Sequence, residues 1–140
     1  MSFDDYANSK IIFQNVRLDT IHPGDKTGHT VDVGLWTGQS IFRNGEIAIT
    51  SGVETSDGRD GALSFRGNLV SVLEDGSTLS SSYEGETRMK SGSNQFTAEG
   101  EWTFASGTGR LAGIKGSGTF KAAGAGDKGH SDCVGKATKA

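Results

Sequence analysis

The stretch SGTGRLAGIKGSGTF, residues 106–120, decides the fold because it can be interpreted in two ways. Gly107, Gly109 and Ala112 match the letters of the G-x-G-x-x-A fingerprint of dinucleotide-binding loops. That fingerprint binds a pyrophosphate only where a helix begins at its glycines. The residues that follow, GIKGSGTF, are too rich in glycine for a stable helix interior. We therefore predict a tight connection followed by a β-strand, and no nucleotide site.

The rest of the chain has the same strand-like pattern, because apolar residues recur at every second position. Short polar turns separate the apolar segments, so neighbouring strands are expected to be antiparallel. About eight strands can close a small barrel that has no edges. The predicted fold class is therefore all-β, with one antiparallel up-and-down β-barrel domain over residues 1–140. The expected strands are residues 10–18, 30–43, 46–54, 62–73, 78–89, 96–104, 113–122 and 129–138.

The composition is compatible with a closed sheet and argues against several partners. Only 33% of the residues are hydrophobic and 22 are glycine, which a barrel tolerates because only alternate residues face inward. The net charge is −3 and no basic stripe is present, so we expect no nucleic-acid partner. The sequence contains no run of about 18 apolar residues, so no membrane helix is predicted. We expect no membrane partner and a cytoplasmic protein, because the start MSFDDYANSK is unlike a signal peptide and Cys133 is the single cysteine.

The segment FRNGEI predicts a β-hairpin. Asn44-Gly45 supplies the two residues that a type I′ turn prefers. A two-residue turn there pairs Phe42 with Ile47 and sets Ile49 on the face of Phe42. We take this face to point into the barrel.

The next hairpin requires a different turn. A two-residue turn at Asp75-Gly76 would mix apolar and charged residues on one face. A three-residue loop ending at Gly76, with a G1 bulge, places the odd-numbered residues of both strands inside. Arg66 then lies outside, near Glu84 and Glu86. The inward residues are Leu63, Phe65, Gly67, Leu69 and Leu73 on one strand and Leu79, Ser81, Tyr83, Gly85 and Met89 on the other.

Continuing this face across the next two strands pairs Tyr83 with Trp102 and sets Trp102 near Gly116. The same pairing produces an inward row of glycines, which are Gly67, Gly85, Gly100 and Gly118. Glycine inside a strand loses packing and costs conformational entropy, so a row of glycines needs a physical reason. Two explanations are open. The glycines let the sheet coil beneath large neighbours such as Trp102, or they leave room for a ligand.

Three polar groups are considered as sites of chemistry, and for each of them a non-catalytic interpretation comes first. His22 and His29 belong to the loop IHPGDKTGH and are expected to be solvated, with no metal site. His130, Asp132 and Cys133 are adjacent in sequence, and a nucleophilic cysteine with its own base is the alternative there. The third group is a cluster of charged side chains that we expect on the outer surface of the barrel. The alternative is that this cluster forms a subunit contact. Its members are Glu84, Glu86, Glu99 and Glu101, near Arg66, Arg88, Lys115 and Lys121.

The inward aromatic residues are the candidate site. They either pack a solid core or line an apolar pocket that has a few polar groups. In the second case Tyr83 is the candidate catalytic residue, because its phenol can donate a hydrogen bond to a substrate carbonyl or ether oxygen. No cofactor is expected. The candidate substrate-binding residues are Phe65, Ser81, Trp102, Phe104 and Phe42.

Residues 96–122, FTAEGEWTFASGTGRLAGIKGSGTFKA, resemble a segment of the allene oxide cyclase and dirigent proteins and their bacterial relatives. Those families share a strand, a Gly-Thr-Gly turn and a glycine-rich strand. Gly107-Thr108-Gly109 stands at the turn, and Leu111 stands where an aromatic residue is commoner. The resemblance covers about the last third of the chain. It implies an eight-stranded antiparallel barrel with a central hydrophobic cavity, usually in a homodimer or homotrimer.

The resemblance also implies a function. Allene oxide cyclases steer a cofactor-free ring closure with the help of a carboxylate, for which no matching position is found in this sequence. We expect a cofactor-independent isomerase or cyclase that acts on an apolar substrate, because holding a reactive conformer requires shape more than ionisable groups. The first alternative is a non-catalytic binding or carrier barrel of lipocalin-like use. The second is a structural protein whose barrel is packed solid.

Overall fold

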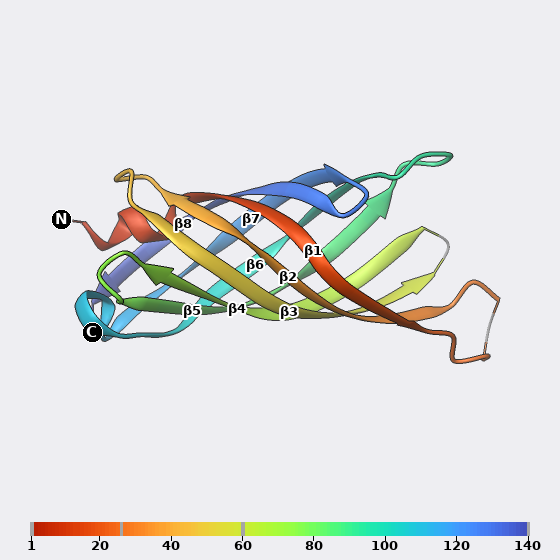
Figure 1. Ribbon diagram of the computed structural model, residues 1–140, viewed down its shortest axis with the longest axis horizontal. Helices are drawn as coiled ribbons and strands as arrows, with labels where there is room; N and C mark the ends of the chain where they lie inside the picture. Colours follow the sequence, from red (N-terminus) through yellow and green to blue (C-terminus); the bar gives the residue numbers. More distant parts are fainter. Residues whose placement is uncertain (1, 26, 60, 140) are drawn as a thin grey trace.

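The chain forms a closed barrel of eight antiparallel strands in sequence order, with β1 pairing β8 to complete the ring (Figure 1). This closed antiparallel barrel confirms the predicted fold class. The computed structural model describes residues 2–25, 27–59 and 61–139. Among the described residues, no helix is long and apolar enough to cross a membrane. The elements are η1 (Phe3–Ala7), β1 (Ser9–Ile21), β2 (Thr30–Phe42), β3 (Ile47–Arg59), β4 (Ala62–Leu73), β5 (Thr78–Met89), β6 (Gln95–Gly107), η2 (Gly109–Leu111), β7 (Ile114–Ala125) and β8 (Lys128–Lys139).

The glycine-rich stretch 106–120 contains no dinucleotide-binding helix. After β6 the chain makes the single 3₁₀ turn η2 and then enters β7 at Ile114. Gly109 and Gly113, on either side of this turn, have positive φ angles of 60° and 81°. Glycine adopts this backbone conformation without the steric cost that other residues have. The predicted tight connection and strand are confirmed.

The hairpin between β4 and β5 has the predicted three-residue loop. The Gly76 amide donates to the Leu73 carbonyl oxygen at 2.9 Å, and Gly76 has a φ of +87°. The Leu73 amide donates to the Ser77 carbonyl oxygen at 2.8 Å, which closes the bulge. Arg66 lies opposite Glu84 on the exposed outer face, as predicted. The alternating apolar pattern was sufficient to fix this register.

The hairpin between β2 and β3 differs from the prediction by one residue. The Gly45 amide donates to the Phe42 carbonyl oxygen at 2.8 Å, so the loop has three residues instead of the two of a type I′ turn. Ile41 therefore pairs with Ile47. Ile47 and Ile49 lie on the outside, 54% and 69% exposed, and their prediction as inward residues is wrong. A shift of one residue reverses both faces of a strand, so the even-numbered residues of β3 point into the barrel.

The pairing of β6 with β7 differs from the prediction by two residues. Trp102 lies opposite Gly118 and not opposite Gly116, while Gly100 pairs with Phe120. The η2 turn centres the connection on Arg110, one residue later than expected. A shift of two residues preserves the faces, so the inward residues of both strands are still predicted correctly.

One end of the barrel is closed by η1, which lies beside the C-terminal end of β8 (Figure 1). Tyr6 and Leu111 are 2% and 0% exposed there. The Arg110 guanidinium donates to Glu46 at 2.7 Å, to Asp75 at 2.6 Å and to the Tyr6 hydroxyl at 3.0 Å. Arg110 and hydrogen bonds from Ser77 lower the pKa of Asp75 to about 2. These contacts join η1 and η2 to two strand turns and close this end of the barrel.

Candidate functional site

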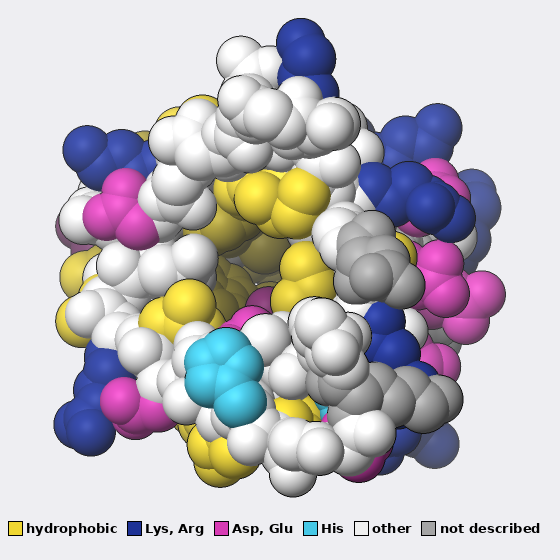
Figure 2. Space-filling view, turned by 90° about the vertical axis from the view of Figure 1, so that its right-hand side faces the viewer, with side chains coloured by type: hydrophobic (Ala, Val, Ile, Leu, Met, Phe, Trp, Pro, Cys, Tyr) yellow, Lys and Arg dark blue, Asp and Glu magenta, His cyan; other side chains and the backbone are white. Residues whose placement is uncertain are grey.

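The barrel encloses a cavity of about 490 Å³. Figure 2 faces the end opposite η1 and shows an opening lined mainly by hydrophobic side chains, with acidic side chains visible inside it. A volume of this size is within the range of small-molecule sites. All six candidate site residues line the cavity; they are Phe42, Phe65, Ser81, Tyr83, Trp102 and Phe104. A barrel packed solid is therefore excluded, while the roles of these six residues remain predictions.

Ten of the 31 described residues that line the cavity are aromatic. The Tyr83 ring lies 6.4 Å from Trp36, 6.1 Å from Phe65 and 6.2 Å from Phe120, measured between ring centroids. Phe13 extends this wall, with its ring 5.9 Å from Trp36. The predicted pairing of Tyr83 with Trp102 across β5 and β6 is confirmed. The Trp102 ring lies against Phe104 instead, with the ring centroids 4.7 Å apart and the planes tilted by 49°.

The glycine row provides space for aromatic rings and backbone, not for a ligand. A Cβ atom on Gly100 would overlap the Glu84 carbonyl oxygen and lie 2.7 Å from Phe120 Cζ. A Cβ atom on Gly118 would lie 2.8 Å from Trp102 Cζ2. The four glycines of the row do not line the cavity. Of the two explanations, the one in which glycines let the sheet coil beneath large side chains is supported.

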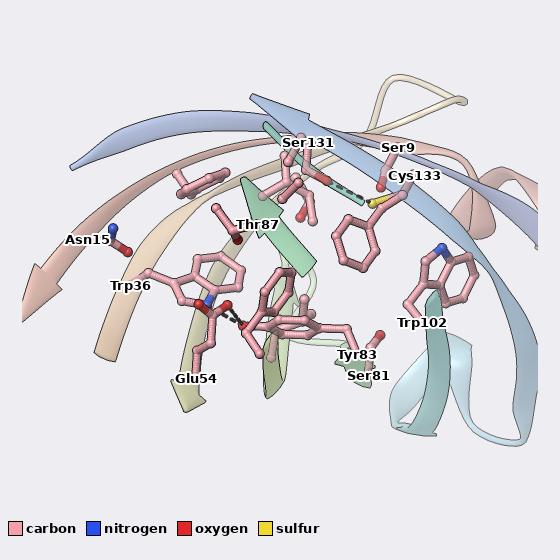
Figure 3. A pocket seen from close by; sticks show the side chains of 18 of the residues that line it. Ser9, Asn15, Trp36, Glu54, Ser81, Tyr83, Thr87, Trp102, Ser131 and Cys133 are labelled. Carbon is pink, nitrogen blue, oxygen red and sulfur yellow. Dashed lines mark hydrogen bonds between the residues drawn. The ribbon is translucent and has the colours of Figure 1, made fainter. Parts of the chain in front are cut away.

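The polar centre of the cavity is a chain of hydrogen bonds between three strands (Figure 3). Trp36 Nε1 of β2 donates to the Tyr83 hydroxyl of β5 at 2.9 Å, and this hydroxyl donates to Glu54 Oε1 of β3 at 2.9 Å. Burial raises the pKa of Glu54, although the hydrogen bond from Tyr83 opposes this effect. Burial and the nearby Glu54 charge also raise the pKa of Tyr83. The site therefore holds a carboxyl group whose ionised form is disfavoured by burial.

Tyr83 occupies its predicted place but already has partners. Its hydroxyl proton is directed to Glu54, so a substrate oxygen would have to compete for it. The cavity wall also includes a second phenol. Tyr6 lines the cavity at its closed end, where its hydroxyl donates to Glu46.

Glu54 is the functional residue that sequence reasoning missed. The two-residue turn assigned to Asn44-Gly45 placed Ile47 and Ile49 inside, and so placed Glu54 outside. A signal was present in the sequence, because Gly45 can end a three-residue loop with a G1 bulge just as Gly76 does. Applying the same turn to both hairpins would have directed Glu54 inward.

A row of buried hydroxyl groups crosses three strands nearer the closed end. The Ser40 and Thr50 hydroxyls lie 2.6 Å apart, and those of Thr50 and Ser71 lie 2.8 Å apart. Ser40 and Ser71 line the cavity. Because these hydroxyls are hydrogen-bonded to one another, this end of the cavity places little demand on a ligand for polar contacts.

His29 is not the solvated loop residue that the sequence suggested. It is 7% exposed, and its two ring nitrogens lie 2.6 Å from Asp25 and 2.8 Å from Asp57. Hydrogen bonds that the ring donates to Asp25 and to Asp57 raise the pKa of His29, the one to Asp25 most, against an opposing effect of burial. This contact joins the 22–29 connection to the end of β3. His22 is exposed, as predicted.

We expect the barrel to be more stable in mildly acidic solution through His29. A raised pKa in the folded state stabilises the protein below the ordinary value of 6.5, and this stabilisation is lost as the pH rises through the folded-state pKa. An NMR titration of the His29 ring protons should give a midpoint above 6.5 that falls in Asp57→Asn. Asp19→Asn, at an exposed ion pair with Arg17, is the control. A His29 midpoint at or below 6.5 would contradict the assigned contact.

The nucleophilic cysteine considered for β8 is not supported. His130 and Asp132 are exposed on the outside, whereas Cys133 faces the cavity, 3.8 Å from the Ser131 hydroxyl (Figure 3). Burial raises the pKa of the Cys133 thiol, which disfavours the reactive thiolate. The alternation of a strand thus separates residues that are adjacent in sequence.

The glutamates of β5 and β6 lie on the exposed outside of the barrel, as predicted. Glu84 is opposite Glu101 and Arg66, and Glu99 is opposite Lys121. The two acidic strands β5 and β6 are flanked by basic residues, Arg66 on β4 and Lys121 on β7, which is compatible with a solvated sheet face.

Comparisons of the chain with protein-family models, with curated proteins and with solved structures gave no match.

Proposed function

We propose that this protein binds an apolar small molecule inside its barrel. The observation that carries the proposal is the cavity itself, which is open at one end and has a largely apolar wall (Figure 2). Water gains few hydrogen bonds from such a wall, so an apolar molecule that displaces it is favoured. The few polar groups, centred on Glu54 and Tyr83, would orient the bound molecule.

A cavity-filling substitution tests this proposal. Ala98 of β6 lines the cavity, and its neighbour Thr97 is exposed on the outside. Nile red, a neutral dye whose emission rises in apolar surroundings, should bind the unchanged protein. Ala98→Phe should weaken its binding by about a hundredfold, because the new ring occupies the site, whereas Thr97→Phe should leave it unchanged. Equal binding by all three proteins would place the dye outside the barrel and contradict the proposal.

A second candidate function is cofactor-independent isomerisation or cyclisation of the bound molecule. The contact between Glu54 and Tyr83 favours it, because a carboxyl group whose pKa is raised by burial is a suitable general acid or base. In an isomerisation, Glu54 would remove a proton from a carbon beside a carbonyl group and return it at another carbon. Tyr83 would donate a hydrogen bond to the oxygen on which charge develops. The alternative, a non-catalytic carrier, would bind the same kind of molecule without this proton transfer.

We also propose that the protein forms a homodimer or homotrimer in the cytoplasm. The outer face of β2, β3 and β4 carries a cluster of exposed apolar residues, and a second copy presents the same cluster. Exposed apolar patches of this kind usually mark protein contacts. Ile49→Lys should lower the mass measured by sedimentation, and a mass unchanged from the monomer in both proteins would contradict the oligomer. The exposed residues of this face are Val33, Leu35, Ile47, Ile49, Val53, Val70 and Val72.

A further inference from the structure

The charged groups on the cavity wall are all of one sign. The wall includes two acidic residues, Asp32 and Glu54, and among the described residues it includes no lysine, arginine or histidine. Asp32 lies toward the open end and accepts a hydrogen bond from Thr20 at 2.6 Å. A ligand that carries a carboxylate or phosphate group would meet two acids and no counter-charge, so anionic ligands are disfavoured.

The Glu54 carboxyl group has capacity for a further partner. Among the described residues, Tyr83 is its only hydrogen-bond partner, and it uses Oε1. Within the same part of the chain, no buried side-chain oxygen or nitrogen lacks a partner. The second oxygen of Glu54 is therefore accessible, and Glu54 lines the cavity. A hydrogen-bond donor on a ligand can reach it.

The surroundings of Glu54 also favour a positive charge. The Tyr83 hydroxyl donates to the carboxyl group and accepts from Trp36 Nε1, and the rings of Phe13 and Phe65 continue the wall beside Trp36 and Tyr83. Aromatic faces attract cations, most strongly where water is excluded. Burial raises the pKa of Glu54 in the absence of a ligand, and a cation beside it favours the ionised form.

We propose that the ligand of this cavity is an apolar amine, bound with its protonated nitrogen against Glu54. This inference rests on the proposed function, because it requires a ligand inside the barrel. The ammonium group donates to the accessible oxygen of Glu54, inside the aromatic wall that includes Trp36 and Tyr83. Its hydrocarbon part fills the aromatic interior. An alcohol of the same shape makes the hydrogen bond but gains neither the ion pair nor the attraction of the rings.

Three compounds with the same chain test the inference at pH 7.5: 1-octylamine, 1-octanol and octanoate. Dissociation constants are measured by displacement of Nile red. Octylamine should bind at least about tenfold more tightly than octanol, and octanoate should bind most weakly. Glu54→Gln keeps the shape of the side chain and should reduce the ratio of amine to alcohol affinity to within about twofold. Glu84→Gln, which removes an exposed carboxylate from the outer face of β5, is the matched control and should preserve the ratio.

The outcomes separate this inference from the function on which it rests. If octanol displaces the dye and octylamine has no advantage, the amine is excluded while a ligand inside the barrel is retained. The same conclusion follows if the advantage of octylamine survives Glu54→Gln, or is lost in Glu84→Gln, because the amine then binds the outer surface. If neither compound displaces the dye from the unchanged protein, the proposed function fails and the amine with it.

Discussion

Replacing Gly100 by alanine is expected to cost about 3 kcal/mol of the free energy of unfolding, because the barrel has no space for one more carbon there. The new Cβ atom would overlap the Glu84 carbonyl oxygen, which belongs to the paired backbone of β5. It would also displace the Phe120 ring, whose Cζ lies 2.7 Å from the position of that atom. Backbone cannot move aside as a flexible side chain can, so the β5–β6 pairing must shift.

Gly34 provides the matched control for this experiment. It also lies within a strand, but the nearest atom to a Cβ at this position is Leu18 Cδ1 at 3.5 Å, an ordinary contact distance. Gly34→Ala should change stability by no more than about 1 kcal/mol. Urea unfolding of both variants measures the difference. Similar stabilities would show that the glycine row is not required for coiling of the sheet.

Replacing Tyr83 by phenylalanine is expected to separate an enzyme from a carrier. If the protein only binds its ligand, the loss of one hydrogen bond should weaken binding by about 0.5–1.5 kcal/mol. If it catalyses an isomerisation, turnover should fall by about 10²–10⁴-fold, because the phenol stabilises charge that develops only in the transition state. The substrate for the assay would come from molecules that co-purify with the barrel, identified by mass spectrometry.

The partner of Tyr83 provides the control for the catalytic interpretation. Glu54→Gln should reduce turnover as strongly, and the double variant should be little worse than either single variant, because residues that act as a unit are not additive. Additive losses would indicate that Tyr83 and Glu54 contribute separately. A Tyr83→Phe protein that turns over its substrate at the original rate would exclude the catalytic role.

Much of the fold could be predicted from alternation and turn chemistry. The eight strands are all present, and the β4–β5 register followed from requiring Phe65 and Leu69 to face inward while Arg66 faces outward. That requirement is strict because a strand has two faces and a shift of one residue exchanges them. The inward positions of Tyr83 and Trp102 followed from the same face.

The candidate site was less predictable, because the inward position of its central residue, Glu54, depends on the length of one turn. Asn44-Gly45 suits a two-residue turn, and the apolar Ile47 and Ile49 made the resulting inward face convincing. In the barrel these isoleucines are exposed, and the inward side of β3 carries small or polar residues instead, Glu54 among them. Hydrophobicity alone identifies the wrong face where the interior is a cavity and the exterior is apolar.

The use of the glycines could not be decided from the sequence. The space above a glycine within a strand can hold either a ligand or an aromatic ring from the next strand. The pattern of residues in the sequence is the same in the two cases. The choice depends on ring orientations, such as that of Phe120 over Gly100, which follow from the coiling of the closed sheet.

The central claim, that a small apolar molecule binds inside the barrel, is tested most directly by locating a bound probe. With methyl groups labelled, NMR measures which side chains lie within about 5 Å of Nile red through nuclear Overhauser contacts. We expect contacts from Ile11, Leu69 and Ala98, which line the cavity. Contacts from Ile49 and Val53 on the outer apolar face, with none from the cavity residues, would contradict the account.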